Sequence, residues 1–173
     1  MQELRAALPD WSISLVDEAV FPDEDAATYY ENARAKARFG RAIGDGDAWI
    51  LGEDSGIEAE ALDGRPGVES ARWASDGVAA LLAALEGTDD RRARYVCELV
   101  GVSPDRQEFR GTGILPGTIA REPRGDEGFG YDPIFVPEGE TRTVAELGNE
   151  WKSGNSHRAR AARALDEAIA AGR

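Results

Sequence analysis

Residues 94–102 read RYVCELVGV, an apolar run that predicts a buried β-strand and decides the class of fold. Residues 108–119 add strand pieces that are broken by glycines and by Pro116. Shorter expected strands and several expected helices lie on both sides of this centre. The expected strands are 48–51, 57–62 and 134–136, and the expected helices are 23–39, 76–86 and 156–171. This mixture of strands and helices predicts an α/β or α+β fold.

The length and the residue counts bound the kind of protein. A chain of 173 residues favours one domain over residues 1–173, because two independent cores would be cramped. One cysteine, Cys97, and one histidine, His157, exclude an internal disulfide framework and a metal site rich in either residue. No apolar run approaches the ~20 residues of a membrane span, and the start MQELRAALPDW lacks the pattern of a secretory signal. These features predict a single-domain cytoplasmic protein.

The acidic balance argues against polyanionic partners. The sequence has 20 Lys and Arg against 33 Asp and Glu, a net charge of −13 at pH 7. Such a surface repels a nucleic-acid backbone and an anionic membrane surface, so we expect neither partner. A small anionic ligand would need a bound cation and clustered basic groups.

Lysine is scarce in this chain. Eighteen of the 20 basic residues are arginine, and the two lysines are Lys36 and Lys152. A GC-rich gene or a salt-adapted cytoplasm would each explain the bias. An ammonium is a compact, mobile charge, whereas a guanidinium is a planar fork. The two lysines are therefore candidates for a role that needs an ammonium group. The alternative is that they were retained by chance despite the bias toward arginine.

Two segments whose polar or aromatic residues are flanked by glycines are candidate sites. Residues 52–56, GEDSG, place two carboxylates directly after the expected strand 48–51. There they could bind a magnesium ion or accept a proton from an attacking water. The alternative is an acidic turn in an acidic protein. Residues 128–133, GFGYDP, flank Phe129 with glycines, which suits stacking on a planar ring. The alternative is a loop that folds its aromatic side chains onto the core.

A third candidate site is the segment 151–158, WKSGNSHR. Ser156 is a good N-cap and would place His157 and Arg158 in the first turn of the expected helix. Because the helix dipole disfavours cations there, an electron-rich ligand would offset the cost; solvent and acidic neighbours are the alternative. In the expected helix 23–39, Glu31 and Lys36 diverge by about 140° and by themselves indicate a solvated face.

Four segments taken together resemble the inosine triphosphate pyrophosphatase family: ENARAKA (31–37), EDSGIEAEALDGRPGVESARWA (53–74), FGYDPIFVPEG (129–139) and AEL…K…SHRARA (145–161). The resemblance covers nearly the whole chain. It implies an elongated α/β fold, with a long mixed β-sheet, flanking helices and two lobes around a nucleotide cleft. It further implies a homodimer and magnesium-dependent hydrolysis of XTP, ITP and dITP to the monophosphate and pyrophosphate.

The resemblance also implies roles for single residues, motif by motif. Asp54 matches the proton acceptor and Mg²⁺ ligand, and Glu31 matches an acidic residue near the metal. Lys36 would lie by the phosphates, and Phe129 would stack on the base. The other implied substrate-binding residues are Ser55, Gly130, Tyr131, Asp132, Lys152, His157 and Arg158.

The chain departs from the family pattern in two places. Glu53 stands where many relatives have aspartate, which keeps the charge and adds a methylene. The opening MQELRAALP resembles the helix that follows a phosphate-binding loop in relatives, so we expect the first strand and that loop to be missing. Two alternatives to the enzyme follow: a weak or inactive nucleotide-binding remnant, and a pyrophosphatase that prefers pyrimidine or modified bases.

Overall fold

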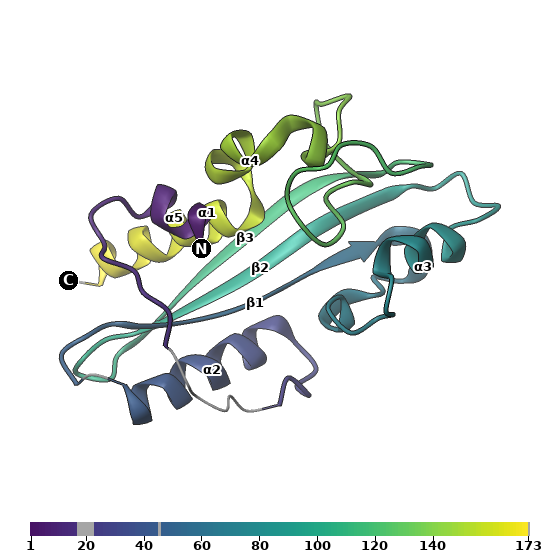
Figure 1. The fold of residues 1–173 in the computed structure, drawn as a ribbon. Helices are drawn as coiled ribbons and strands as arrows, with labels where there is room; N and C mark the ends of the chain where they lie inside the picture. The colour runs from purple at the N-terminus through teal and green to yellow at the C-terminus, as the bar shows by residue number, and fades with distance from the viewer. Residues whose placement is uncertain (17–22, 45, 173) are drawn as a thin grey trace.

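Three long antiparallel strands form the centre of the molecule, as Figure 1 shows. The computed structural model describes residues 1–16, 23–44 and 46–172. The sheet has the order β1-β2-β3-β4. Its strands are β1 (Ile50–Ala59), β2 (Arg92–Val102), β3 (Glu108–Ile119) and β4 (Phe135–Pro137). The helices are α1 (Gln2–Ala7), α2 (Tyr29–Ile43), α3 (Gly77–Ala84), α4 (Val144–Asn155) and α5 (His157–Ala171), with short 3-10 turns at Glu60–Leu62 and Gly67–Glu69.

The strand β1 is continuous where the sequence predicts two separate strands at residues 48–51 and 57–62. The prediction of a break at residues 52–56 is wrong, because the two glycines serve close packing rather than a turn. A Cβ on Gly52 would lie 2.2 Å from the carbonyl oxygen of Ala33 in α2, and one on Gly56 would lie 2.3 Å from that of Gly67. Both glycines therefore let other backbone approach the strand.

Helices cover both faces of one end of the sheet (Figure 1). On one face α5 packs on β3, where a Cβ on Gly111 would lie 2.1 Å from the carbonyl oxygen of Ala161. Gly111 and Gly113, two of the glycines that predict breaks in residues 108–119, thus mark the contact with α5, whereas Gly117 lies against β4. The strand β3 runs without interruption. On the other face α2 packs on β1 and β2 through Ala33 and Ala37.

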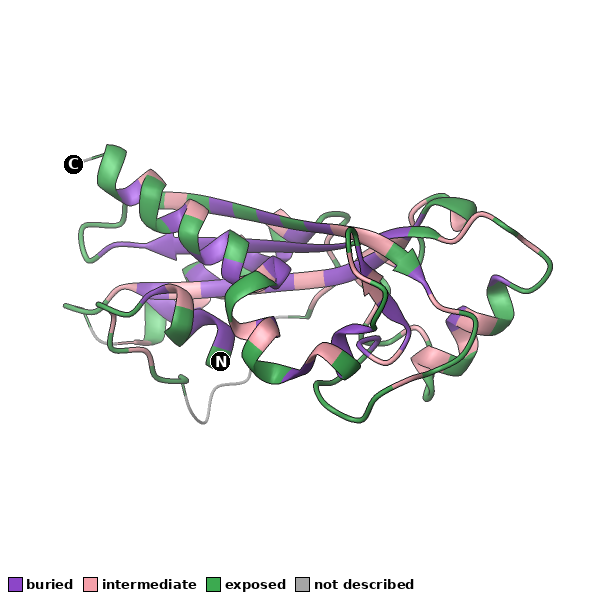
Figure 2. Cartoon of the chain, turned by 90° about the horizontal axis from the view of Figure 1, so that it is seen from above, coloured by how far each residue is buried: buried purple, intermediate pink, exposed green. Residues whose placement is uncertain are grey.

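A second core lies at the other end of the strands. It joins α3, the 3-10 segment at residues 60–62 and the residues around Tyr131 to the same three strands, through Leu81, Leu85, Ile134 and Phe135. Figure 2 shows the elongated outline and the buried positions that run along the strands. The expected α/β fold with flanking helices is therefore confirmed. All described strand pairs are antiparallel, however, where a mixed sheet was expected.

Helix boundaries follow the capping residues. α2 begins at Tyr29, six residues later than predicted, because the hydroxyl of Thr28 accepts the Glu31 N–H at 3.2 Å and caps the helix there. The prediction for α5 is confirmed, with Ser156 as its N-cap. The helix α4, which the sequence analysis missed, starts at a capping box of Thr143 and Glu146. No helix in the described ranges combines the length and apolar character that crossing a bilayer requires.

Candidate active site

Asp54 and Lys36 form a buried pair between β1 and α2. The Lys36 ammonium lies 3.1 Å from Oδ1 of Asp54, and the Asn32 amide donates to Oδ2 at 3.1 Å. Lys36 also contacts Oε1 of Glu24 at 2.5 Å. Asp54 itself is only 6% exposed. One ammonium therefore lies between two carboxylates, which leaves a local excess of negative charge.

The environment of this pair sets the protonation of both groups. Burial raises the pKa of Asp54 above its ordinary value, although Lys36 and Asn32 oppose that shift. Burial acts to lower the pKa of Lys36, but Glu24 and Asp54 outweigh it and the pKa is raised. The two shifts are compatible, because Lys36 has two anionic partners and Asp54 has one cationic partner. Lys36 thus remains charged while Asp54 becomes a better proton acceptor.

Glu53 faces the other side of the sheet from Asp54, because successive side chains of a strand alternate. Its Oε1 accepts a hydrogen bond from Nε of Arg158 at 3.1 Å. Nη2 of Arg158 donates to the Ser55 hydroxyl at 2.9 Å, and Nη1 lies 3.7 Å from a carboxylate oxygen of Glu3. The acidic neighbours thus offset the cost of a cation in the first turn of α5.

Phe129 presents its ring to solvent above two cations. The side chain is 58% exposed, and its centroid lies 3.7 Å from the Lys152 ammonium and 5.1 Å from the Arg158 guanidinium carbon. The loop is held by the buried Asp132, which accepts from the Phe129 N–H at 2.8 Å and from Lys152. Gly128 has φ of 81°, and a Cβ there would lie 2.2 Å from Asp132, so only glycine fits.

His157 is buried in the wall of the same site. Its ring stacks on that of Tyr95, with centroids 4.5 Å apart and planes 9° from parallel. Burial, reinforced by Arg158 and Lys152, lowers the pKa of His157 well below its ordinary value. Its Nδ1 has no hydrogen-bond partner among the described residues. His157 is therefore a neutral imidazole.

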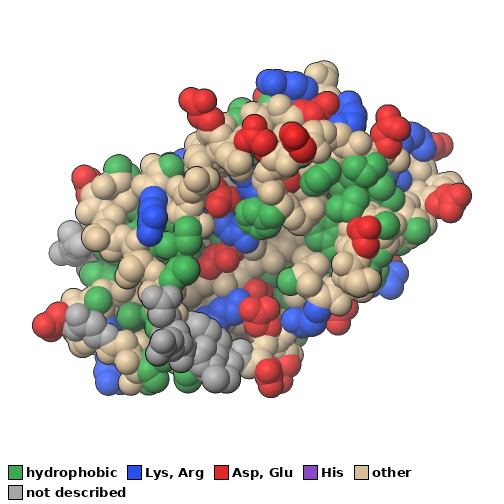
Figure 3. Space-filling model, viewed as in Figure 1, with side chains coloured by type: hydrophobic (Ala, Val, Ile, Leu, Met, Phe, Trp, Pro, Cys, Tyr) green, Lys and Arg blue, Asp and Glu red, His purple; other side chains and the backbone are tan. Residues whose placement is uncertain are grey.

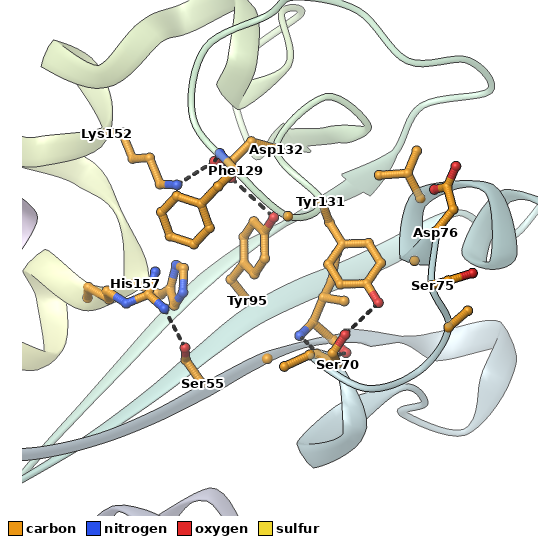
Figure 4. A pocket seen from close by; sticks show the side chains of 18 residues that line it. Ser55, Ser70, Ser75, Asp76, Tyr95, Phe129, Tyr131, Asp132, Lys152 and His157 are labelled. Carbon is orange, nitrogen blue, oxygen red and sulfur yellow. Dashed lines mark hydrogen bonds and ion pairs between the residues drawn. The ribbon is translucent and has the colours of Figure 1, made fainter. Parts of the chain in front are cut away.

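Two adjoining cavities meet at Phe129 and Arg158, which line both. The smaller, of about 520 Å³, extends from Lys152 and His157 to Tyr131, as Figure 4 shows. The larger, of about 900 Å³, includes Lys36 and is walled partly by α1. In Figure 3, acidic and basic side chains gather in the hollowed middle of this face. One elongated ligand can therefore contact both cavities.

The predicted site residues are distributed over these cavities with two exceptions. Asp54 lies against Lys36 and borders neither cavity. Glu31 is exposed at the start of α2, where its carboxylate accepts the Thr28 hydroxyl at 2.9 Å. The smaller cavity is lined by the remaining predicted residues other than Lys36: Ser55, Phe129, Gly130, Tyr131, Asp132, Lys152, His157 and Arg158.

Sequence reasoning missed several residues that belong to this arrangement. Glu24 reaches Lys36 from a segment that was predicted to be helical, and no local pattern identifies that contact. Asn32 lies inside the ENARAKA motif but received no role. Tyr95 received no role within the expected strand 94–102, and its hydroxyl is the one feature that indicates a polar partner.

The donor set around Lys36 fits a magnesium ion. Mg²⁺ is held by one or two carboxylates together with waters and substrate phosphates, so it needs no dense cluster of protein ligands. No group of three or more His, Cys, Asp or Glu suited to a metal occurs in residues 1–16, 23–44 and 46–172. The oxygens of Asp54 and Glu24, which share one ammonium, are ligands of the required chemistry.

An α/β fold whose adjoining cavities contain an exposed aromatic ring over two cations and, further along, a lysine backed by a buried carboxylate is that of a nucleotide-binding protein. The sequence model described as the Ham1 family matches residues 1–168. This chain belongs to the Ham1 family.

Relatives agree with this assignment over most of their length. The chain is 42% identical to the dITP/XTP pyrophosphatase of Bdellovibrio bacteriovorus over 179 residues, covering 97% of this chain and 89% of the relative. It is also 42% identical to the dITP/XTP pyrophosphatase of Deinococcus deserti over 175 residues, covering 97% and 83%. The resemblance read from the four motifs is thereby confirmed.

Solved structures share the fold. The Staphylococcus aureus Ham1 protein superposes with a TM-score of 0.84 at 33% identity, covering 99% of this chain and 93% of that one. A nucleoside-triphosphatase / dITP/XTP pyrophosphatase from Mycobacterium abscessus gives 0.71 at 42% identity, covering 87% and 80%.

Proposed function

We propose that the protein is a nucleoside-triphosphate pyrophosphatase that hydrolyses XTP, ITP and dITP to the monophosphate and pyrophosphate. The observation that carries the proposal is the position of Phe129 and Arg158 at the border of both cavities. The dITP/XTP pyrophosphatases among its relatives support the same activity.

In this proposal the base and the phosphates occupy different cavities. The base stacks on Phe129, where Lys152 and Arg158 offer hydrogen-bond donors that suit the O6 acceptor of hypoxanthine or xanthine. The triphosphate extends toward Lys36 in the larger cavity. Ser55 and Tyr131 line the smaller cavity and complete the walls around the nucleoside.

Asp54 is the proposed catalytic base. It accepts a proton from the water whose oxygen bonds to phosphorus, while the phosphoanhydride bond breaks and pyrophosphate leaves. Asp54 together with Glu24 or Glu31 would hold Mg²⁺, which neutralises phosphate charge when it is bound. Lys36 stays charged beside Asp54 and offers a second positive group to the phosphates.

Further proposals concern the molecule as a whole. We propose one domain, since the three long strands take part in cores at both ends of the sheet. Homodimer formation rests on the family resemblance, and sedimentation tests it. Cytoplasmic location rests on the single buried Cys97, and the absence of a nucleic-acid partner rests on the net charge of −13.

The decisive experiment measures pyrophosphate release from XTP, ITP, dITP, GTP and ATP, with and without Mg²⁺. We expect a high kcat/KM for the first three and a low one for ATP, because adenine presents an amino donor to the Lys152 and Arg158 donors where the 6-oxo purines present an acceptor. Equal constants for ITP and ATP would contradict the proposal. Binding without turnover would favour the inactive remnant. A higher kcat/KM for CTP or UTP in the same assay would favour a pyrophosphatase that prefers pyrimidine bases.

A further inference from the structure

Tyr95 lies at the point where the two halves of the base-binding end meet. It lies in β2, between the neighbouring strands, and is paired with Ile57 of β1 and Leu115 of β3. The residue is 7% exposed and lines the smaller cavity. Figure 4 shows its ring between His157 on one side and the loop that carries Asp132 on the other. A rigid central strand therefore supports two elements that come from distant parts of the sequence.

The hydroxyl of Tyr95 holds one side of Asp132. It donates to Oδ1 at 3.2 Å, whereas Oδ2 accepts from Lys152 and from the Phe129 N–H. Asp132 is 1% exposed, so its orientation is set by these partners and by the loop that surrounds it. Through Asp132, two successive hydrogen bonds connect the Tyr95 hydroxyl to Lys152 and to Phe129.

The ring of Tyr95 supports the other half of the site. It stacks on His157, the first residue of α5, with parallel planes and centroids 4.5 Å apart. On another side it packs against Phe135, also at 4.5 Å. Phenylalanine would supply these ring contacts equally well. The hydroxyl is therefore not explained by packing, and in the buried site its hydrogen bond is to a carboxylate.

We propose that Tyr95 is a positioning residue, whose hydroxyl fixes Asp132 and thereby the Phe129 ring and the Lys152 ammonium in the geometry that binds the purine base. The inference rests on the proposed function and adds to it a residue outside the four family-like segments. Because the base lies apart from the reacting phosphorus, the loss of this hydroxyl removes binding common to the ground state and the transition state. Such a loss raises KM and leaves kcat nearly unchanged.

The test compares Tyr95→Phe with the parent and with Tyr30→Phe. The control removes a hydroxyl from a tyrosine that lies under Arg110 and borders neither of the two adjoining cavities. For Tyr95→Phe we expect KM for ITP to rise about tenfold, with kcat within about twofold of the parent. Tyr30→Phe keeps both constants. A parental KM in Tyr95→Phe, or a fall in kcat at parental KM, would overturn the proposal.

A second measurement does not depend on turnover. The amide resonance of Phe129 reports its hydrogen bond to Asp132, and the single imidazole of the chain, that of His157, reports ring stacking. We expect Tyr95→Phe to move the Phe129 resonance and to leave the His157 signals, whereas Tyr95→Leu moves both. An unmoved Phe129 resonance in Tyr95→Phe overturns the positioning role. If the parent fails to hydrolyse ITP while the Phe129 resonance moves as expected, the proposed activity is wrong but the positioning of the Phe129 loop by Tyr95 is supported.

Discussion

The ammonium of Lys36 lies 3.1 Å from Oδ1 of Asp54, across the contact between α2 and β1. This contact depends on Gly52, which lets the helix backbone approach the strand two residues before Asp54. A charged donor and a buried proton acceptor are thereby held side by side at the edge of a nucleotide-sized cleft. The pair gives the first prediction.

Asp54→Asn should abolish most activity without unfolding the protein. The substitution keeps the shape of the side chain but removes the charge that accepts the proton, so kcat/KM for ITP should fall about 10²- to 10⁴-fold. The melting temperature should stay near that of the parent, since burial already disfavours the Asp54 charge. Glu58→Gln is the matched control, because it neutralises a carboxylate of the same strand that pairs with the half-exposed Arg94. A kcat/KM within a few-fold of the parent in Asp54→Asn would remove Asp54 from the mechanism.

Phe129→Ala should weaken binding of the base. Stacking on an aromatic ring contributes about 1–3 kcal/mol per base, so KM for ITP should rise about 5- to 150-fold. Because the Phe129 ring is largely exposed, thermal stability should change little. Phe129→Tyr keeps the ring and serves as the control. Steady-state kinetics of both variants check the prediction, and equal KM values for the alanine and tyrosine variants would contradict it.

His157 should remain neutral through the physiological pH range. Its pKa in the folded protein is lowered by burial, so the unfolded chain binds a proton more readily than the folded one. Its contribution to stability is therefore fully present above the unfolded pKa of about 6.5 and is lost as the pH falls toward the folded value. Chemical denaturation at several pH values should show a weaker acid destabilisation in His157→Gln than in the parent. If the free energy of unfolding falls equally with pH in both proteins, or if the imidazole NMR signals titrate near neutrality, His157 is not a buried neutral residue.

Gly113→Ala should disturb both stability and activity. A Cβ at this position of β3 would lie 1.9 Å from the carbonyl oxygen of His157, so the first turn of α5 must move. We expect a loss of about 1–3 kcal/mol in the free energy of unfolding, together with a higher KM for ITP. Gly154→Ala in α4 is the control, since a Cβ there meets nothing within 4 Å. If both variants unfold at the same temperature, the close approach of α5 to β3 is not as tight as described.

Local signals in the sequence predicted some elements that depend on local chemistry, although the capping box that begins α4 was missed. Ser156 begins α5 as expected, because an N-cap bonds to its own helix. The roles of Gly52 and Gly56 could not be read in this way, since glycines around acidic residues look alike in a turn and in a closely packed strand. The difference is made by Ala33 and Gly67, which are distant in sequence.

The same distinction between local signals and distant contacts applies to the residues of the candidate site. The family-like segments carry Phe129 and Lys152, and the structure brings these two residues to one cavity, while their roles remain predictions. Glu24 could not, because its contact with Lys36 depends on where α2 begins. Tyr95 lies in a strand whose apolar character concealed its one polar contact.

The opposed directions of Glu53 and Asp54 constrain how the gene can vary. Glu53 reaches Arg158 on one face of the sheet, and Asp54 reaches Lys36 on the other. Insertion or deletion of a single codon within β1 would turn every following side chain to the opposite face. Because such a change would separate Asp54 from Lys36 and Glu53 from Arg158, length variation among descendants of this gene should fall in the connecting segments.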